Sequence, residues 1–358
     1  MTDQNDIDQL VELTKRTGLT NIAPSIDFRG QTVLITGGAD GVGAAAVKAM
    51  HRFGAHIIAL DVQAEKLAAL KAELGDERIT TIPFDLSQSD DEAYEELGKA
   101  ILDGSPSGKI DAYMMHAGVV KMTDITVHNT VANTPMSEFY KMAQINAFSH
   151  AAIYQKIRPA FADNARIVLT TSPIVGRAAP STAAYSVTKR MLEDIANNIA
   201  AELKDTNIKV QGFVPPPVQN FLRKDLKPNE PVHAHPEGID IVELPLRLAA
   251  PDVKGEFNGK VVAYGYDHLR KSDVNSAGEK YDYMPRDPSD NGFVYDLRER
   301  YISRGVGDLG ETIMLDYSTH AMRAFMGAGR TPDMIVDQKI DDVYQAPEHI
   351  ASARRPKP

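Results

Sequence analysis

Cysteine is absent from this chain of 358 residues, and so is tryptophan. Without cysteine the chain can form no disulfide, no thiolate nucleophile and no thiolate ligand for a metal. A basic patch is also missing, because the formal net charge is −10 and the basic cluster at 354–357 is short and terminal. An acidic surface repels a phosphate backbone, so nucleic acid is not an expected partner.

Long apolar runs are lacking as well. The first residues are acidic and polar, which is not typical of a secretory signal peptide. No apolar run approaches the roughly 18 residues that a membrane helix needs. The sequence therefore predicts a soluble cytoplasmic protein without membrane partners.

What the chain does contain is an alternation of short apolar, β-branched runs with longer amphipathic stretches. The short runs predict about seven buried strands, at 31–36, 56–60, 80–84, 112–115, 166–170, 209–214 and 260–264. The longer stretches predict helices, at 42–53, 63–74, 90–103, 136–160, 183–204 and 239–249. This alternation is typical of an α/β fold, a Rossmann-like doubly wound parallel sheet with helices on both faces.

The alternating pattern divides the chain into three parts. It fills 29–266, which we expect to be one catalytic domain. Residues 1–28 form a lead-in with one short helix at about 5–17. Residues 267–358 show little periodicity apart from a helical stretch at 310–326, so we expect a mostly irregular C-terminal extension that contacts a neighbouring subunit or covers the active site.

The turn after the first predicted strand is rich in glycine, since residues 36–43 read TGGADGVG. Glycine permits a tight turn and lets the backbone approach a pyrophosphate, and a helix N-terminus offers free N–H groups and a favourable dipole. Strand, glycine-rich turn and helix follow in the order that this site requires. The sequence therefore predicts dinucleotide binding, with contacts from Gly37, Asp40, Gly41, Val42 and Gly43.

An acidic residue ends the second predicted strand. Asp61 lies 18 residues after Gly43, where a carboxylate can accept hydrogen bonds from ribose hydroxyls. A carboxylate there repels a 2′-phosphate, the next residue is Val62, and Asp40 stands in the glycine-rich turn where a basic residue would favour a phosphate. These features predict NAD rather than NADP, with Val62 beside the ribose.

The next two strand ends extend the cofactor site. Asp85 follows the third strand and can accept a hydrogen bond from the adenine amino group, with Leu86 beside it. The fourth strand ends in His116, Ala117 and Gly118. The small residues in this set would let the cofactor lie against the sheet.

Tyr185 and Lys189 are four positions apart in the sequence (i and i+4), so on a helix their side chains lie on one face. A free tyrosine has a pKa near 10, and an ammonium beside it lowers that pKa by favouring the phenolate. The same lysine can bind the nicotinamide ribose. Ser172 follows the fifth strand and faces the same crevice, where its hydroxyl can stabilise charge on a substrate oxygen.

These motifs together resemble the short-chain dehydrogenase/reductase family, in its compact single-domain, NAD-dependent form. The resemblance covers about 29–266 and rests on two sets of residues: the glycine motif at 36–43, and Ser172, Tyr185 and Lys189. The family adds a catalytic Asn on the preceding helix, and Asn146 matches it. The C-terminal extension is not part of the family pattern.

The resemblance implies a role for each matched residue in hydride transfer between NAD(H) and a secondary alcohol or ketone. Tyr185 would be the general acid and base, and Lys189 would lower the pKa of Tyr185 and bind ribose. Ser172 would orient the substrate oxygen, and Asn146 would support a proton relay. Members of the family form homodimers or homotetramers through the helices that carry Asn146 and Tyr185.

Two positions depart from the family pattern. His116 stands where the family usually has Asn. Pro216 stands where Gly is usual, which forbids a positive φ and stiffens the turn after the sixth strand. We still expect Pro215 and Val218 to contact the nicotinamide end of the cofactor.

Substrate and reaction type leave alternatives open. The loop at 219–238 should cover the substrate, and its His233 and His235 do not share a helix face, so no metal site is expected. One alternative function is a regulatory NAD-binding protein that has lost the chemistry. Another is an epimerase or dehydratase that uses a transient keto intermediate. The sequence names neither the substrate nor the favoured direction.

Overall fold

The computed structural model describes the core of the chain and parts of its C-terminal third. The described residues are 27–75, 77–120, 130–172, 175, 182–215, 218, 238, 242–250, 258–263 and 294–296. The helices predicted at 5–17 and 310–326 lie outside these residues, as does most of the predicted extension.

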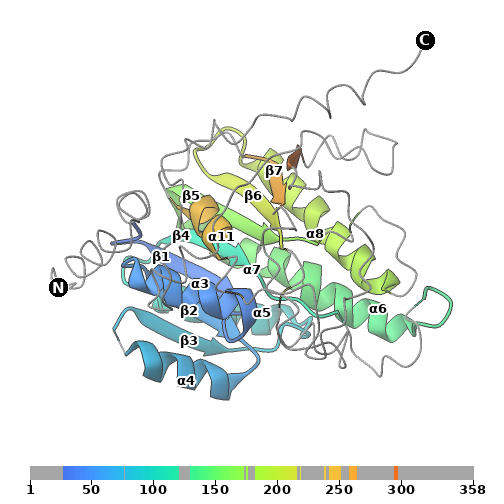
Figure 1. Cartoon of the computed structure of the whole chain (residues 1–358), viewed down its shortest axis with the longest axis horizontal. Helices are drawn as coiled ribbons and strands as arrows, with labels where there is room; N and C mark the ends of the chain where they lie inside the picture. Colours follow the sequence, from blue (N-terminus) through green and yellow to red (C-terminus); the bar gives the residue numbers. More distant parts are fainter. Residues whose placement is uncertain are drawn as a thin grey trace, which may run out of the picture.

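An eight-stranded sheet forms the centre of the molecule, in the order β3-β2-β1-β4-β5-β6-β7-β8 (Figure 1). The seven predicted strands are confirmed, and they pair in parallel. Their bounds are β1 Thr32–Thr36, β2 His56–Asp61, β3 Ile79–Pro83, β4 Ile110–Met115, β5 Phe161–Thr170, β6 Lys209–Val214 and β7 Lys260–Ala263. The eighth strand, β8 (Val294–Asp296), pairs antiparallel with β7.

Strand β8 comes from the segment in which the sequence showed little periodicity. Three residues are too few for a period of two to stand out among polar neighbours. Val262 pairs with Val294 and Lys260 with Asp296. A segment of the predicted extension therefore contributes a strand to the sheet.

Helices cover both faces of the sheet, as the sequence predicts. One face carries α3 (Gly41–Arg52), α4 (Ala64–Leu74) and α11 (Glu243–Ala249). The other face carries α5 (Asp91–Asp103), α7 (Ser149–Ile157) and α8 (Ala183–Glu202). Within the described part of the chain, every helix is too short or too polar to cross a bilayer.

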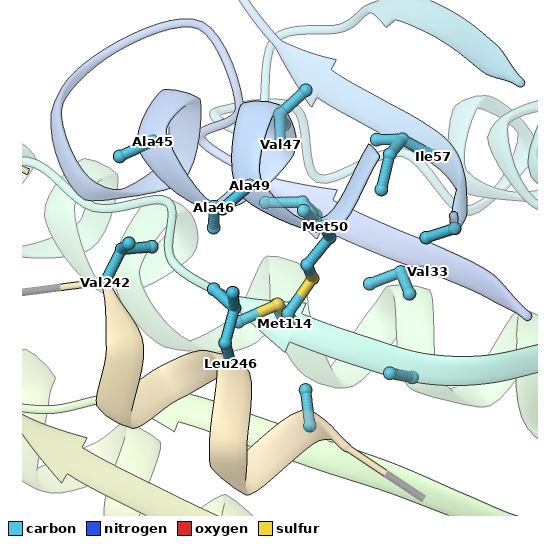
Figure 2. Close-up of a cluster of buried hydrophobic side chains, with 14 of the residues drawn as sticks. Val33, Ala45, Ala46, Val47, Ala49, Met50, Ile57, Met114, Val242 and Leu246 are labelled. Carbon is cyan, nitrogen blue, oxygen red and sulfur yellow. The ribbon is translucent and has the colours of Figure 1, made fainter. Parts of the chain in front are cut away.

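Two hydrophobic clusters fill the spaces between these layers. Figure 2 shows part of the first, where Leu246 and Val242 lie beside Ala46, Met50 and Met114, so that α11 packs against α3 over β4. All of these side chains are buried. Burial of a Leu, Val or Met side chain stabilises a fold by about 1.5–3 kcal/mol, so the cluster fixes α3 firmly on the sheet.

The stretch predicted to be helical at 136–160 is helical throughout, in four consecutive segments. They are α6 (Met136–Ala143), the π-helix η1 (Gln144–Phe148), α7 and the 3-10 helix η2 (Arg158–Ala160). The prediction is confirmed, although hydrophobic periodicity does not reveal the turn with i→i+5 bonds. Such π turns are frequent at functional sites.

Strand order reverses between β1 and β4, since β2 and β3 follow β1 to one side while β5, β6 and β7 follow β4 to the other. The crevice at the carboxyl ends of the strands beside such a reversal is where doubly wound folds bind ligands. Every site residue predicted from a strand end lies along this edge.

Candidate active site

The glycine-rich turn joins β1 to α3 and lies against the end of β4. Gly37 has a φ of +69°, and a Cβ there would lie 2.9 Å from the Cα of Ala117. A Cβ on Gly43 would lie 2.0 Å from the carbonyl oxygen of Gly37. Both positions therefore require glycine, and the turn is compact enough to form a cradle at the start of a helix.

Asp40 caps the helix that follows this turn. Its Oδ1 accepts a hydrogen bond from the N–H of Gly41 at 2.8 Å. Val42 and Gly43 lie in the first turn of α3, where backbone N–H groups have no partner within the helix. These N–H groups and the helix dipole suit an anion at this end of α3.

Asp61 is buried at the carboxyl end of β2, with 8% of its surface exposed. Its Oδ2 accepts a hydrogen bond from the N–H of Ala39 at 3.1 Å, and its Oδ1 accepts one from the N–H of Gln63 at 3.0 Å. These bonds fix the carboxylate against the glycine-rich turn. The sequence placed Asp61 at this point, and the structure brings it into contact with the cradle.

Lys66 is a basic residue near the ribose position that the sequence reasoning missed. It lies on α4, and its Nζ is 3.1 Å from the Oδ2 of Asp40. No Lys or Arg is adjacent to Asp61 in sequence, but the first turns of α4 bring this ammonium back to the glycine-rich turn. Its charge is balanced by Asp40, and both side chains are partly exposed.

The adenine end of the predicted site is open. Asp85 is exposed, and its Oδ1 accepts a hydrogen bond from the N–H of Ser87 at 2.8 Å. Leu86 is buried, and its carbonyl accepts a hydrogen bond from the Tyr94 hydroxyl at 3.2 Å. Val62 is 63% exposed. An exposed apolar side chain between two acidic strand ends leaves a surface on which a flat ring can lie.

His116, Ala117 and Gly118 follow β4 and are anchored to β1. The hydroxyl oxygen of Thr36 accepts hydrogen bonds from the N–H groups of His116 and Ala117, each at 3.2 Å. The Nδ1 of His116 is hydrogen-bonded to the Oγ1 of Thr170 on β5. His116 thus links two neighbouring strand ends, which is a task that the Asn usual in the family could also perform.

Burial, together with the charges of Lys189 and His150, lowers the pKa of His116 to about 3. The ring is therefore neutral at pH 7. Its edge packs against Phe213, with ring centroids 5.6 Å apart. Its Nε2 is buried without a hydrogen-bond partner among the described residues.

Ser172, Tyr185 and Lys189 are brought together as the sequence predicts. Tyr185 and Lys189 lie in the first two turns of α8, and the Lys189 Nζ is 5.9 Å from the centroid of the Tyr185 ring. Ser172 follows β5, is buried, and forms a side-chain hydrogen bond with Tyr185. A hydroxyl, a phenol and an ammonium thus meet at the carboxyl end of β5.

The pKa of Tyr185 differs from the sequence expectation. Burial raises it to about 12, and the hydrogen bond from Ser172 opposes that rise. The Lys189 ammonium donates to the carbonyl of Thr170 at 2.9 Å, and burial remains the main influence on the Tyr185 pKa. Burial lowers the pKa of Lys189 to about 8. The lowering of the Tyr185 pKa by Lys189 therefore stays a prediction.

Asn146 is fully buried within the π-helix η1. Its amide binds the backbone of Val119 twice: Oδ1 accepts from the N–H at 2.7 Å and Nδ2 donates to the carbonyl at 2.8 Å. Nδ2 also donates to the hydroxyl of Thr188 on α8 at 3.0 Å. Asn146 thus holds the chain after β4 and the helix that carries Tyr185 in fixed positions.

The nicotinamide end is described only in part. Val218 is buried in the first hydrophobic cluster, and Pro215 follows β6. Pro216 lies outside the described residues, as does the loop at 219–237 with His233 and His235. The predictions on the substrate loop therefore stay predictions.

Comparisons with known proteins agree with this geometry. The family described as short chain dehydrogenase matches residues 31–231. The chain is 31% identical over 220 residues to short chain aldehyde dehydrogenase 1 of Euphorbia lathyris, an alignment that covers 59% of this chain and 74% of that protein. It is 28% identical over 189 residues to a very-long-chain 3-oxoacyl-CoA reductase of Coccidioides immitis, covering 51% and 52%.

Solved structures show the same fold. A short chain dehydrogenase of Shigella flexneri, complexed with NADP, has a TM-score of 0.56 and 21% identity, over 63% of this chain and 93% of that chain. Fold, site and sequence match define an oxidoreductase with a doubly wound α/β domain. The chain belongs to the short-chain dehydrogenase family.

Proposed function

We propose that the chain transfers a hydride between NAD(H) and a secondary alcohol or ketone. The observation that carries this proposal is the meeting of Ser172, Tyr185 and Lys189 at the carboxyl end of β5, with Asn146 fixing the helix behind them. The two relatives described above are named for an aldehyde dehydrogenase and an oxoacyl reductase. Both names concern carbonyl groups, which supports a carbonyl or carbinol substrate.

The cradle of glycines fits a dinucleotide. Gly37 and Gly43 leave no room for a Cβ, and the first turn of α3 offers N–H groups for a pyrophosphate. Asp61 would bind the ribose hydroxyls nearest adenine, and Lys189 those of the nicotinamide ribose. When bound, the nicotinamide supplies or accepts the hydride.

The chain's own residues handle the proton. With a pKa near 12 the phenol of Tyr185 keeps its proton at pH 7, so it can donate that proton to a ketone oxygen while Ser172 hydrogen-bonds the same oxygen. In the reverse direction Tyr185 must accept the proton of an alcohol. The Lys189 ammonium, whose Nζ is 5.9 Å from the centroid of the Tyr185 ring, would favour the phenolate in that step.

Replacement of Tyr185 tests the reaction. A Tyr185→Phe variant keeps the ring and loses the proton donor, so kcat/KM should fall by about 10²–10⁴-fold, while the affinity for NADH stays unchanged. The assay follows NADH absorbance with a panel of secondary alcohols and ketones. Tyr140→Phe is the matched control, because Tyr140 is 69% exposed on α6. Equal turnover by Tyr185→Phe and the parent would refute the mechanism.

We propose NAD rather than NADP as the cofactor. The buried Asp61 carboxylate faces the glycine-rich turn, and the nearby Lys66 is balanced by Asp40, so a 2′-phosphate would meet net negative charge. The related structure from Shigella flexneri is a complex with NADP, so family membership alone does not decide the cofactor. The choice depends on these residues.

Binding measurements test this choice. Titration of the parent by reduced-nicotinamide fluorescence should give at least about tenfold tighter binding of NADH than of NADPH, since a repelled phosphate costs about 1.4 kcal/mol or more. Asp61→Asn should reduce the difference between the affinities for NADH and NADPH. Asp85→Asn is the control, because an adenine contact is common to both cofactors and its loss leaves the ratio unchanged. Equal affinities in the parent would overturn the Asp61 argument.

We further infer that the chain forms a homodimer or homotetramer through α6, η1 and α8. Four large apolar side chains on these elements are exposed: Met136, Tyr140, Phe148 and Val187, at 58%, 69%, 49% and 49%. An exposed group of apolar side chains on neighbouring helices supports an interface. The same elements carry Asn146 and Tyr185, so packing of a second subunit against them would stabilise the positions of these two residues.

A further inference from the structure

A buried carboxylate lies beside the reaction centre and has no part in the mechanism above. Glu193 is 1% exposed on α8, one turn after Lys189 and two turns after Tyr185. Burial of an ionised carboxylate is costly unless it is paired and hydrogen-bonded. The buried carboxylate of Glu193 beside the buried Lys189 therefore needs hydrogen-bond partners or a paired charge that offset the cost of its burial.

Glu193 binds the strand end that carries Ser172. The hydroxyl of Thr171 donates a hydrogen bond to the Oε1 of Glu193, and both side chains are buried. The N–H of Thr171 donates to the carbonyl of Phe213 on β6 at 3.0 Å. Thr171 is thus fixed to α8 by its side chain and to the sheet by its backbone, and Ser172 is the next residue.

The neighbours of Thr171 are also tied to α8. The Thr170 carbonyl accepts the Lys189 ammonium, and Ser172 binds Tyr185. Three consecutive residues, Thr170 at the end of β5 and the two that follow it, therefore contact three turns of α8. Of the three residues of α8 that make these contacts, Glu193 lies furthest along the helix from Tyr185 and is 1% exposed.

The charge of Glu193 acts on Lys189. Burial lowers the pKa of Lys189, and Glu193 opposes that effect. The other titratable groups that face Lys189 in the described part of the chain are Tyr185 on the same helix, His116 after β4 and His150 on α7. The pKa values of His116 and His150 are lowered to about 3 and about 4, so both rings are neutral at pH 7 and add no charge near Lys189.

We propose that Glu193 is a positioning residue of the reaction centre, which holds the segment of Ser172 through Thr171 and places a buried carboxylate one helical turn from Lys189. This inference rests on the proposed function, in which Lys189 binds the nicotinamide ribose. It assigns two separable effects to one side chain. The charge acts on Lys189, and the hydrogen bond acts on Ser172.

The charge is tested by the pH dependence of NADH binding. In the parent, affinity should fall as Lys189 loses its proton, with a midpoint near pH 8, and Lys189→Met should abolish that fall. Glu193→Gln removes the charge with little change of shape, so the midpoint should move down by about one pH unit. Glu193→Asp keeps the charge and should leave the midpoint in place. A Glu193→Gln midpoint equal to that of the parent would overturn the electrostatic role.

The hydrogen bond is tested by kinetics on the intact enzyme. Thr171→Val keeps the shape and loses the hydroxyl, so kcat should fall on the order of tenfold as Ser172 loses its fixed position, with the pH midpoint of NADH binding unchanged. Thr171→Ser restores the hydroxyl and should recover kcat. A Thr171→Val enzyme with the kcat of the parent would overturn the positioning role.

These outcomes separate the inference from the proposed function. A parent that binds neither NADH nor NADPH would overturn the proposed function and this inference with it. A parent that binds NADH with a pH-dependent affinity, while Glu193→Gln and Thr171→Val behave like it, would overturn the inference alone.

Discussion

At the scale of the residue, the reaction centre depends on an unusually tight contact at Gly118. A Cβ on this residue would lie 3.1 Å from the Nζ of Lys189 and 3.3 Å from the Oδ1 of Asn146. Contacts at such distances are closer than ordinary van der Waals separation, so one partner must move. An added Cβ would therefore shift the Lys189 ammonium or the Asn146 amide by a few tenths of an ångström.

Gly118→Ala should therefore reduce activity without unfolding the protein. The added methyl displaces the Lys189 ammonium, so we expect NADH affinity and kcat/KM each to fall on the order of tenfold, with an unchanged circular dichroism spectrum. Gly104→Ala is the matched control, because a Cβ there meets Thr80 at 3.0 Å, but Gly104 caps the C-terminus of α5 ahead of β4 and lies away from the carboxyl edge of the sheet. Parent-like NADH binding by Gly118→Ala would contradict the prediction.

Some residues of the reaction centre can be predicted from the sequence, and others are found only in the structure. The four residues of the predicted reaction centre all have distinctive spacing or family counterparts, and the structure brings Ser172, Tyr185 and Lys189 together. Glu193 and Thr171 have neither a distinctive spacing nor a family counterpart among the motifs, and a Glu one turn after a Lys is typical of a solvated helix surface. Burial alone distinguishes Glu193 from a surface residue, and burial depends on the packing of α8 against the sheet.

At the scale of the element, α6, η1 and α8 form one unit. The π turn holds Asn146 at the junction of α6 and α7, and the Asn146 amide joins this helix to Thr188 on α8. The outer surface of the same unit exposes Met136, Tyr140 and Phe148. One side of the unit thus carries the residues of the predicted reaction centre, and the other exposes an apolar surface.

A charge on this apolar surface should weaken assembly. Tyr140→Asp places a carboxylate among exposed apolar side chains, and burying it in an interface carries a large desolvation cost. We expect the molar mass measured by light scattering to fall from that of an oligomer toward 39.2 kDa, with the fold retained. Tyr140→Phe should assemble as the parent does. A parent that is already monomeric would refute the proposed assembly.

Elements were predicted well where the sequence is periodic. The strand at 209–214 is found with those bounds, and the strand at 166–170 begins five residues earlier, at Phe161. The earlier residues were missed because Asp163 and Asn164 interrupt the apolar run and are exposed. The helix at 239–249 is observed as Glu243–Ala249. Tertiary pairing, rather than local composition, extends β5 through its polar start.

At the scale of the whole molecule, buried histidines link stability to pH. His150 is fully buried, its Nε2–H donates to the Ala117 carbonyl at 3.1 Å, and its Nδ1 accepts from the Tyr113 hydroxyl at 3.2 Å. Burial lowers its pKa to about 4. In the unfolded chain the pKa is near 6.5, so acid favours the unfolded state, which binds the proton more readily.

The free energy of unfolding should therefore fall as the pH drops from 6.5 toward 4. His150 alone should make the protein about 2 kcal/mol less stable at pH 5 than at pH 7.5, on top of the effects of other groups. Urea unfolding at several pH values measures this, and His150→Gln should flatten the dependence by that amount. Parallel curves for His150→Gln and the parent would show that His150 does not titrate as its burial requires.

Strand β8 has a consequence for the solution behaviour of the chain. It covers the outer edge of β7 with antiparallel hydrogen bonds, and an uncovered strand edge presents unpaired N–H and C=O groups that another molecule can join. The segment 264–293 connects the two strands along the chain. Proteolytic cleavage within it would free β8 to dissociate, and the exposed edge of β7 would then favour aggregation by edge-to-edge pairing. Strand β8 thus covers an edge at which the sheet would otherwise be open to self-association.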